Sequence, residues 1–354
     1  MSRFFSDKYR ELTAYTPGEQ PKDAQYIKLN TNESPFPPSE KAAAAAAEAA
    51  KHLQLYNDPT CSLLTEKTAE VLGVSPEEVL MTNGSDEILN FAFQAFCDQT
   101  HPAIFPDITY GFYRVFAQVN GVPFREIPLD EDFNVCVDDY LGCGGTIFLA
   151  NPNAPTGKAL PLCEIEKILQ LNPDNVVVID EAYVDFGGES AVPLIRRYEN
   201  LLVTQTFSKS RSLAGGRLGF GVGCKALMQD LNTIKYSTNP YNVNSMTQAM
   251  GIEILEDEER TKKNCAAICE TREYTTNSLK QLGFSVLPSK TNFVFAASDR
   301  IAGGELYRKL KERGVLVRHF DLPRLKNYNR ITVGSREQMD VLLTQVKEIL
   351  EEQS

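Results

Sequence analysis

Short apolar runs alternate with helical patterns along most of the chain, and this alternation limits the folds that the chain can adopt. The runs are residues 79–82, 103–105, 146–150, 176–179 and 201–203. Strands that are apolar throughout lie in sheets covered on both faces, where neighbouring strands are mostly parallel. The sequence therefore predicts an α/β fold with a mostly parallel sheet.

The C-terminal part continues the alternation after a helical region. Residues 241–279 predict one long helical stretch. Beyond it, strand and helix patterns alternate again over residues 291–296, 303–311, 315–318, 330–333 and 337–350. This arrangement predicts a smaller α/β domain at the C-terminal end.

Polar residues follow each of the five apolar runs. They are residues 83–87, 106–111, 151–157, 180–183 and 206–209. Open parallel sheets bind their ligands beyond the carboxyl ends of the strands. We therefore expect these five polar segments to converge on one crevice.

Charge and cysteine content narrow the possible functions. A net charge of −11 argues against nucleic acid and anionic membranes as partners. The eight cysteines form no Cys-x-x-Cys pair and the chain has three histidines, so we expect no metal site. The N-terminal sequence is charged from its start, and no apolar run is long enough to span a membrane. We expect a cytoplasmic protein with reduced thiols.

One lysine lies where lysines are uncommon. Lys209 falls between residues 201–204 and 219–223, two segments with the pattern of buried strands. Ammonium groups are seldom buried without a partner, so this position needs a chemical reason. A lysine amine can attack a carbonyl and form a Schiff base. If the carbonyl belongs to pyridoxal phosphate, the site also needs a phosphate cradle, a carboxylate for the pyridine nitrogen, a donor for the ring hydroxyl and a flat partner for the ring.

A predicted helix start offers the phosphate cradle, because helix N-termini bind anions. The residues at this start are Gly84, Ser85 and Asp86. Ser208 can add a hydroxyl, and Arg217 can add a guanidinium. We expect the glycine pair at 215–216 to let the chain turn so that Arg217 points back towards the cradle.

Three further residues suit the ring of such a cofactor. Asp180 ends an apolar strand, where an ionised carboxylate is costly unless it faces a cation such as a protonated pyridine nitrogen. Tyr183 can donate to the ring hydroxyl, and Tyr110 can stack on the ring. Three of these features also have a structural interpretation: Asp180 as a helix cap, Tyr110 as core packing and residues 83–85 as a turn. The prediction of a pyridoxal-phosphate site therefore depends on all of these residues occurring together, in this order along the chain.

Three motifs resemble those of the fold-type I pyridoxal-phosphate aminotransferases. They are Asn-Pro-Asn-Ala-Pro-Thr-Gly at 151–157, Asp-Glu-Ala-Tyr at 180–183, and Ser-Lys at 208–209 with an arginine at 217. A narrower resemblance, to the members of that family that act on histidinol phosphate, is carried by residues 29–33, 56–59, 83–87, 109–113, 291–293 and 330–337. The resemblance implies a large domain over residues 36–260, with a seven-stranded, mostly parallel sheet sandwiched by helices. It also implies an N-terminal arm over residues 1–35 that packs on a small α/β domain at 261–354.

The resemblance implies a role for each residue of the site. Lys209 would carry the cofactor and act as general base, Asp180 would face the pyridine nitrogen, and Tyr183 would contact the ring hydroxyl. The other implied cofactor-binding residues are Gly84, Ser85, Asp86, Tyr110, Asn153, Thr206, Ser208, Arg217 and, from the neighbouring subunit, Tyr56. The implied substrate-binding residues are Arg330, for the anionic end of the substrate, and Arg318, Tyr15, Asn32 and Asn292.

The implied reaction is transamination of L-histidinol phosphate with 2-oxoglutarate, which gives imidazole-acetol phosphate and glutamate in histidine biosynthesis. The implied active unit is a homodimer, because Tyr56 would reach the cofactor of another copy. A Schiff-base aldolase without a cofactor would need neither Asp180 nor Arg217, and three further alternatives stay open. They are an aromatic amino acid aminotransferase, a pyridoxal-phosphate lyase such as a threonine-phosphate decarboxylase, and the effector-binding module of a transcription regulator.

The chain departs from the family pattern at two places. The family has a second asparagine before Pro-Thr-Gly, where this chain has Ala154. Either Asn153 reaches the ring hydroxyl through a shifted loop, or Tyr183 makes that contact alone. Beside Tyr56, the family commonly has arginine and proline where this chain has Leu55 and Asn57.

Overall fold

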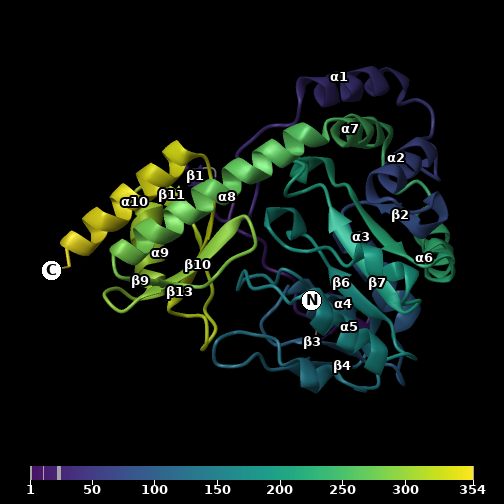
Figure 1. The fold of residues 1–354 in the computed structure, drawn as a ribbon, viewed down its shortest axis with the longest axis horizontal. Helices are drawn as coiled ribbons and strands as arrows, with labels where there is room; N and C mark the ends of the chain where they lie inside the picture. Colours follow the sequence, from purple (N-terminus) through teal and green to yellow (C-terminus); the bar gives the residue numbers. More distant parts are fainter. Residues whose placement is uncertain (1, 11, 22–24, 354) are drawn as a thin grey trace.

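The computed structural model describes residues 2–10, 12–21 and 25–353 (Figure 1). Its largest sheet has seven strands in the order β2-β8-β7-β6-β5-β3-β4. The strands are β2 (Val79–Thr82), β3 (Ala103–Pro106), β4 (Phe124–Ile127), β5 (Thr146–Ala150), β6 (Val177–Asp180), β7 (Leu201–Thr206) and β8 (Gly219–Gly223). Strand β8 is antiparallel to both of its neighbours, and the other neighbouring strands pair in parallel. The predicted α/β fold with a mostly parallel seven-stranded sheet is therefore confirmed.

Helices cover both faces of this sheet because successive strand residues point to opposite sides. On β5, Ile147 and Leu149 join one core cluster with Ile165 of α5. Phe148, which lies between them, joins a second cluster with Phe93 of α3. The helices are α1 (Glu40–Ala49), α2 (Ser62–Leu72), α3 (Ser85–Phe96), α4 (Phe112–Asn120), α5 (Leu162–Leu171), α6 (Lys225–Thr238), α7 (Ser245–Glu256), α8 (Glu258–Gln281), α9 (Gly303–Glu312) and α10 (Arg336–Glu351).

Short 3-10 helices fill several of the connections. They are Asp7–Tyr9, Ala50–His52, Pro76–Glu78, Val137–Tyr140, Val184–Phe186, Val192–Arg196 and Ala214–Gly216. In the part of the chain that the structure describes, no helix has the length and apolar character needed to cross a membrane.

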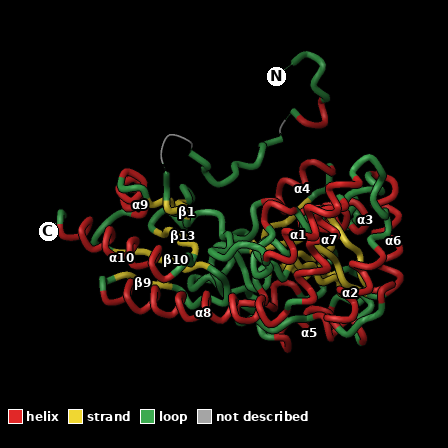
Figure 2. Tube along the Cα trace, turned by 90° about the horizontal axis from the view of Figure 1, so that it is seen from above, coloured by secondary structure: helices red, strands yellow, loops and turns green. Residues whose placement is uncertain are grey.

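A smaller sheet forms the C-terminal lobe, with the strand order β12-β13-β10-β9. Its strands are β9 (Phe284–Val286), β10 (Phe293–Ser298), β12 (Arg318–His319) and β13 (Tyr328–Thr332). Seen from above, α8 runs along one side of this lobe towards the large sheet (Figure 2). The boundary predicted between residues 260 and 261 falls inside α8.

The segment before α1 joins the C-terminal lobe through a two-stranded parallel sheet. Strand β1 (Ile27–Lys28) pairs with β11 (Val315–Leu316). Residues 1, 11 and 22–24 of the predicted arm, and residue 354 of the predicted small domain, lie outside the described residues. The pairing holds the adjoining segment, residues 29–34, between the two lobes of the molecule.

The long helical stretch predicted from residue 241 is wrong in detail. Helix α7 begins at Ser245, and a break at Asp257, with φ −111° and ψ 51°, separates it from α8. Aspartate favours helix ends over interiors because its side chain competes for backbone hydrogen bonds. Glu258 and Glu259 then lie in the first turn of α8, where negative charge is favourable.

Candidate active site

The carboxyl ends of the large-sheet strands open into two adjoining cavities. The smaller has a volume of about 180 Å³ and the larger about 470 Å³. Residues shared by their walls are Thr31, Tyr110, Ala154, Tyr183 and Lys209. Residues that follow β2, β3, β5, β6 and β7 all line one cavity or the other, so the predicted convergence of the five polar segments is confirmed.

Most of the predicted site residues line these cavities. Those in the wall of the smaller cavity are Ser85, Asp86, Tyr110, Asp180, Tyr183, Thr206, Ser208, Lys209 and Arg217. Those in the wall of the larger cavity include Tyr15, Asn32, Arg318 and Arg330. Four predicted residues line neither cavity: Gly84, Asn153, Tyr56 and Asn292.

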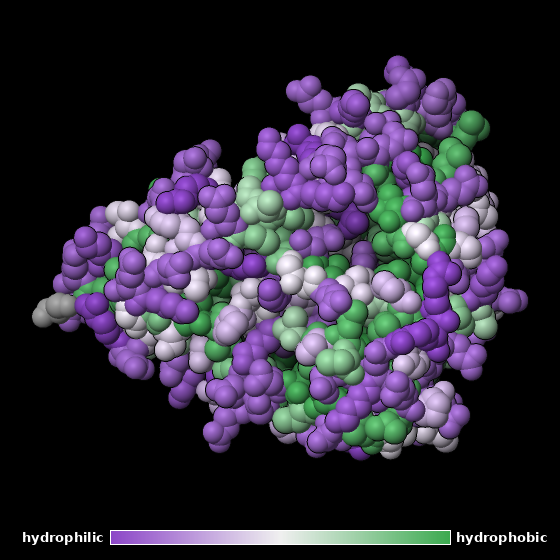
Figure 3. Space-filling view, viewed as in Figure 1, coloured by the Kyte–Doolittle hydropathy of each residue, from purple (hydrophilic) through white to green (hydrophobic). Residues whose placement is uncertain are grey.

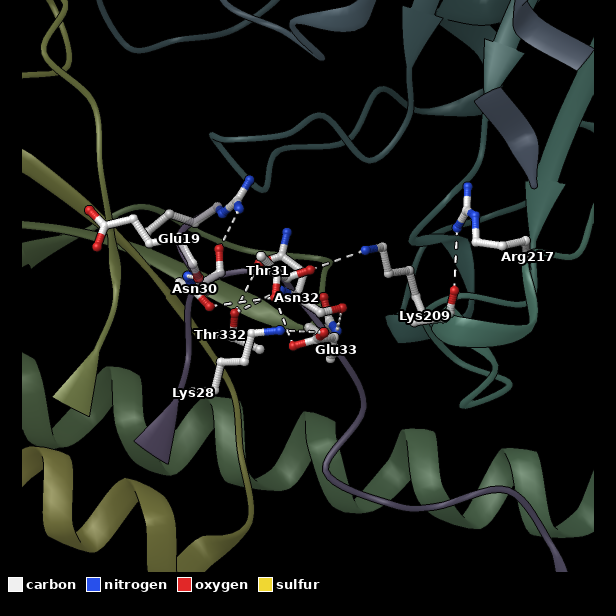
Figure 4. A network of polar contacts seen from close by, with 12 residues as sticks. Glu19, Lys28, Asn30, Thr31, Asn32, Glu33, Lys209, Arg217 and Thr332 are labelled. Atoms are coloured by element: carbon white, nitrogen blue, oxygen red, sulfur yellow. Dashed lines mark hydrogen bonds and ion pairs between the residues drawn. The ribbon is translucent and has the colours of Figure 1, made fainter. Parts of the chain in front are cut away.

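Lys209 extends from the end of β7 across the cavity to the loop that precedes α1 (Figure 4). Its Nζ donates to the backbone oxygen of Thr31 at 3.2 Å. The hydroxyl of Thr31 donates in turn to Glu33 Oε2 at 2.7 Å, and Lys28 Nζ lies 2.6 Å from Glu33 Oε1. Burial raises the pKa of Glu33, but the hydrogen bonds from Lys28 and Thr31 outweigh it and lower that pKa. Glu33 is therefore an anion already paired with Lys28, and the Lys209 amine is held by a carbonyl.

Asp180 lines the smaller cavity and is 4% exposed. Tyr113 Oη donates to its Oδ2 at 3.0 Å, and Thr204 Oγ1 donates to its Oδ1 at 3.2 Å. Burial raises the pKa of Asp180 to about 6, while the bonds from Tyr113 and Thr204 act in the opposite direction. The partners of this carboxylate in the described chain are hydroxyls and a backbone N–H rather than a cation. Such a group can accept the N–H of a bound cation.

A second group of residues in the wall of the smaller cavity offers donors for an anion. Ser85 is the first residue of α3, whose N-terminal N–H groups attract negative charge. Arg217 Nη1 lies 3.4 Å from Ser208 Oγ, and its Nη2 lies 3.2 Å from Asp86 Oδ2. The hydroxyls, the helix start and the guanidinium together match the donors that bind phosphate.

Glycine allows the close approach on which this cradle depends. Gly84 has φ +74°, and a Cβ there would lie 2.5 Å from Arg217 Nη2. A Cβ on Gly219 would lie 2.5 Å from the backbone nitrogen of Ser85. Gly84 therefore acts behind the cavity wall, as the N-cap of α3, and any side chain at either glycine would push the cradle apart.

The glycine pair before Arg217 contributes close approach rather than a positive φ, because a Cβ on Gly216 would lie 2.5 Å from the Leu213 side chain. The glycine pair at 215–216 lies in a 3-10 helix, Ala214–Gly216, and neither glycine has a positive φ. Arg217 itself has φ 56° and is the left-handed residue of the turn. The hydrogen bonds to Ser208 and Asp86 hold this strained residue in place.

The two predicted ring-binding tyrosines have fixed hydroxyls. Tyr110 Oη donates to Asp86 Oδ1 at 2.6 Å, and burial, with Asp86 adding to it, raises the pKa of Tyr110 well above its usual value. Tyr183 Oη accepts from Asn32 Nδ2 at 2.8 Å, which leaves the proton of Tyr183 available as a donor. Lys209 Nζ lies 5.8 Å from the centre of the Tyr183 ring.

Asn153 does not reach the cavity. Its Oδ1 accepts from Thr109 Oγ1 at 2.7 Å, and its Nδ2 donates at 3.0 Å to both Ile108 O and Thr156 Oγ1. An amide has only two N–H donors, so none is left for a ring hydroxyl. Ala154 occupies the walls of both cavities instead. The structure therefore favours the alternative in which Tyr183 acts without Asn153.

Two arginines face each other at the far side of the larger cavity. Arg318 and Arg330 are directly paired in the antiparallel register of β12 and β13. Arg318 donates at 3.3 Å to the backbone oxygens of Thr16 and Pro17, and Arg330 Nη2 donates at 3.0 Å to Asn30 O. The Nε of Arg330 is buried and has no hydrogen-bond partner in the described chain. Like charges in such a pair are unfavourable, so the arrangement fits a dianion that lies between them.

No carboxylate relieves this pair within the described residues. Glu19, whose pKa is lowered by Lys311 and in part by Arg318, is bound instead to Lys311 and Tyr307. Burial lowers the pKa of Arg330, and repulsion from Arg318 lowers it further. An anionic ligand would offset both unfavourable effects by supplying an opposite charge.

Asn292 and Tyr56 lie outside the cavities for different reasons. Asn292 Nδ2 donates to Asn32 O at 3.0 Å and so supports Asn32 from behind. Tyr56 is 84% exposed and stacks on Tyr241, with 4.6 Å between ring centres. Within one chain, Tyr56 therefore contributes nothing to either cavity.

Sequence reasoning missed the two hydroxyls that hold Asp180. Tyr113 is three residues beyond Tyr110 and points inwards from α4. Thr204 lies opposite Asp180 in the parallel register of β6 and β7. The second could have been found from the sequence, because adjacent parallel strands of matched register place Asp180 beside Thr204. The first depends on how α4 packs on the sheet.

Comparison with known proteins identifies the family. The family described as aminotransferase class I and II matches residues 24–346. The chain is 49% identical over 355 residues to the histidinol-phosphate aminotransferase of Aromatoleum aromaticum, a match that covers 99% of this chain and 100% of the relative. It is 47% identical over 352 residues to the histidinol-phosphate aminotransferase of Brachyspira hyodysenteriae, with 99% of each covered.

A solved structure supports the fold. The crystal structure of histidinol-phosphate aminotransferase from Sinorhizobium meliloti, in complex with pyridoxal-5'-phosphate, matches with a TM-score of 0.89. The match covers 100% of this chain and 99% of that chain, at 22% identity.

Proposed function

The chain belongs to the class I and II aminotransferases, and we propose that it transfers the amino group of L-histidinol phosphate to 2-oxoglutarate with pyridoxal phosphate as its cofactor. The main observation that supports this substrate is the pair Arg318 and Arg330. They face each other in the wall of the larger cavity without a carboxylate partner in the described chain. Lys209 lines that same cavity. A substrate with an amine and a separate dianionic group matches this arrangement.

The smaller cavity fits pyridoxal phosphate in the chemistry of its donors and acceptors. Ser85, Ser208 and Arg217 would hold the phosphate. Asp180, a buried carboxylate without a cationic partner in the described chain, would accept the ring N–H. Tyr183 would donate to the ring hydroxyl and Tyr110 would cover a ring face.

Lys209 and Asp180 would have separate roles in handling protons during the reaction. When bound, pyridoxal phosphate withdraws electrons from the α-carbon of an amine. The free amine of Lys209 takes the proton from that carbon as general base and returns it in the next step. Thr31 O holds this amine beside the cavity, at 3.2 Å. Asp180 keeps a proton on the ring nitrogen, because a buried carboxylate is stabilised by a paired cation.

Arg330 and Arg318 would bind the anionic end of both substrates in turn. A guanidinium offers parallel N–H donors that suit phosphate and carboxylate alike. Histidinol phosphate has a phosphate where glutamate has its side-chain carboxylate. One site can therefore serve the donor and 2-oxoglutarate, which react one after the other.

The active unit that we propose is a homodimer. Apolar side chains lie exposed around residues 53–63, and Figure 3 shows apolar surface at the loop between α1 and α2. Leu53, Leu55 and Leu63 are more than half exposed, at 51%, 66% and 68%. Such a patch marks an interaction surface. A second copy placed there would cover it and would let Tyr56 reach the phosphate cradle of its neighbour.

The choice of amino donor tests this proposal. We expect kcat/KM for L-histidinol phosphate to exceed that for L-histidinol, which lacks the phosphate, by about a hundredfold or more, since charge-assisted bonds to Arg330 are lost. Glutamate formed from 2-oxoglutarate is the readout. Faster reaction with phenylalanine or tyrosine would indicate an aromatic amino acid aminotransferase. Release of carbon dioxide from threonine phosphate without 2-oxoglutarate would indicate a lyase.

A further inference from the structure

The carboxylate of Asp180 is held from beneath the smaller cavity by a tyrosine that does not line that cavity. Tyr113 is fully buried on α4, and its hydroxyl donates to Asp180 Oδ2 at 3.0 Å. Its ring is fixed by packing against Phe105 and Phe148, with 5.8 Å between ring centres in both cases. The hydroxyl therefore meets the carboxylate in one defined position.

We propose that Tyr113 is a positioning residue for the transamination: its hydroxyl orients the Asp180 carboxylate and weakens it as a base, which keeps the proton on the pyridine nitrogen of bound pyridoxal phosphate. The inference rests on the proposed function in one respect, namely that pyridoxal phosphate occupies the smaller cavity. It assigns a role to a residue that touches neither cofactor nor substrate.

The physical basis is competition for one proton between a carboxylate oxygen and a ring nitrogen. A carboxylate buried away from water becomes a stronger base, whereas each hydrogen bond donated to its charged form weakens it. Burial raises the pKa of Asp180 to about 6, and Asp86 raises it as well. Tyr113 and Thr204 oppose this rise. Without the donor from Tyr113, the proton moves away from the nitrogen and towards Asp180.

Among the groups that face Asp180, Tyr113 has the largest effect that lowers the pKa of Asp180. The acids and tyrosines around it are Asp86, Tyr110 and Tyr113. Lys209 and Tyr183 line the same cavity. Burial also raises the pKa of Tyr113 well above its usual value, so this hydroxyl keeps its proton and stays a donor over the working pH range of the enzyme.

A second buried tyrosine provides a matched control. Tyr140 is also fully buried, but its hydroxyl has no hydrogen-bond partner in the described chain. Replacing either tyrosine with phenylalanine removes one oxygen from the core and leaves the ring in place. Only Tyr113→Phe removes a donor from Asp180. Thr204→Val removes the other side-chain donor to the same carboxylate and serves as a second variant.

The test uses full-length protein loaded with pyridoxal phosphate that is labelled with 15N in the ring. In wild type and Tyr140→Phe, we expect the 15N chemical shift of a protonated pyridine nitrogen. In Tyr113→Phe, the shift should move towards that of the neutral ring, and Thr204→Val should move it in the same direction. The kcat with L-histidinol phosphate should fall roughly ten- to a hundredfold in Tyr113→Phe, with KM changed by less than about threefold.

Each other outcome overturns the proposal. An unchanged nitrogen shift in Tyr113→Phe, with wild-type protein active, would overturn this inference and leave the proposed function standing. Equal losses of kcat in Tyr113→Phe and Tyr140→Phe would show a general packing effect instead. If Tyr113→Phe does not fold, an unchanged shift in Thr204→Val decides against the idea. If wild type binds no pyridoxal phosphate, both this inference and the proposed function fail.

Discussion

Replacing Lys209 with alanine is expected to lower turnover of L-histidinol phosphate by about 10⁴-fold or more. The amine is the nucleophile that carries the cofactor and the base that moves the substrate proton, so the change removes both contributions. The measurement is glutamate formation at saturating donor and 2-oxoglutarate. Because the one hydrogen bond of Lys209 Nζ within the described residues is to Thr31 O, its loss should leave the fold intact.

Two controls separate chemistry from folding in this experiment. Lys158→Ala removes another lysine, whose Nζ donates to Asn134 Oδ1 at 2.8 Å outside both cavities, and should leave turnover within about twofold of wild type. Borohydride reduction of loaded wild-type protein should fix the cofactor to Lys209, as identified by peptide mass. Turnover above about a hundredth of wild type in Lys209→Ala would contradict the assignment.

Replacing Arg330 with alanine is expected to remove the preference for a phosphorylated donor. Loss of one partner of a buried charge pair costs about 2–5 kcal/mol. About 1.4 kcal/mol corresponds to a factor of ten. The value of kcat/KM for L-histidinol phosphate should therefore decrease by a factor between about thirty and several thousand. Binding of 2-oxoglutarate should weaken as well, because the same guanidinium would hold its carboxylate. The loss with unphosphorylated L-histidinol should be much smaller.

An arginine outside the cavities serves as the control for Arg330. Arg308 lies on α9 of the same lobe and pairs with Glu312 at 2.6 Å on the surface. Exposed pairs of this kind contribute little to stability, so Arg308→Gln should behave as wild type. If Arg330→Ala lowers kcat/KM equally for the phosphorylated and unphosphorylated donors, Arg330 does not bind the phosphate.

The strands and the residues just beyond them were predictable because both depend on local pattern. Apolar runs had to be buried, and parallel strands place their carboxyl ends together. Ser85, Asp180 and Ser208 follow from those two facts, and all three line the smaller cavity. The break at Asp257 was not predicted, because charged residues on both sides of it suit a solvated helix as well as a helix end.

The directions in which side chains point could not be predicted from the sequence. Asn153 belongs to a motif with the right composition, but its amide is used by Ile108, Thr109 and Thr156. The left-handed turn at 217 is made by the arginine rather than by the glycines before it. The hydrogen bond from Tyr113 to Asp180 depends on how α4 packs on the sheet. Each of these depends on contacts between segments far apart in the chain.

The most direct test of the central claim is a single half-reaction. Protein loaded with pyridoxal phosphate is mixed with stoichiometric L-histidinol phosphate in the absence of 2-oxoglutarate, and the visible absorbance of the bound cofactor is recorded. We predict that this absorbance is lost, that the absorbance of pyridoxamine phosphate appears, and that one keto product forms for each active site. No spectral change with L-histidinol phosphate, while phenylalanine converts the cofactor under the same conditions, would contradict the proposed function.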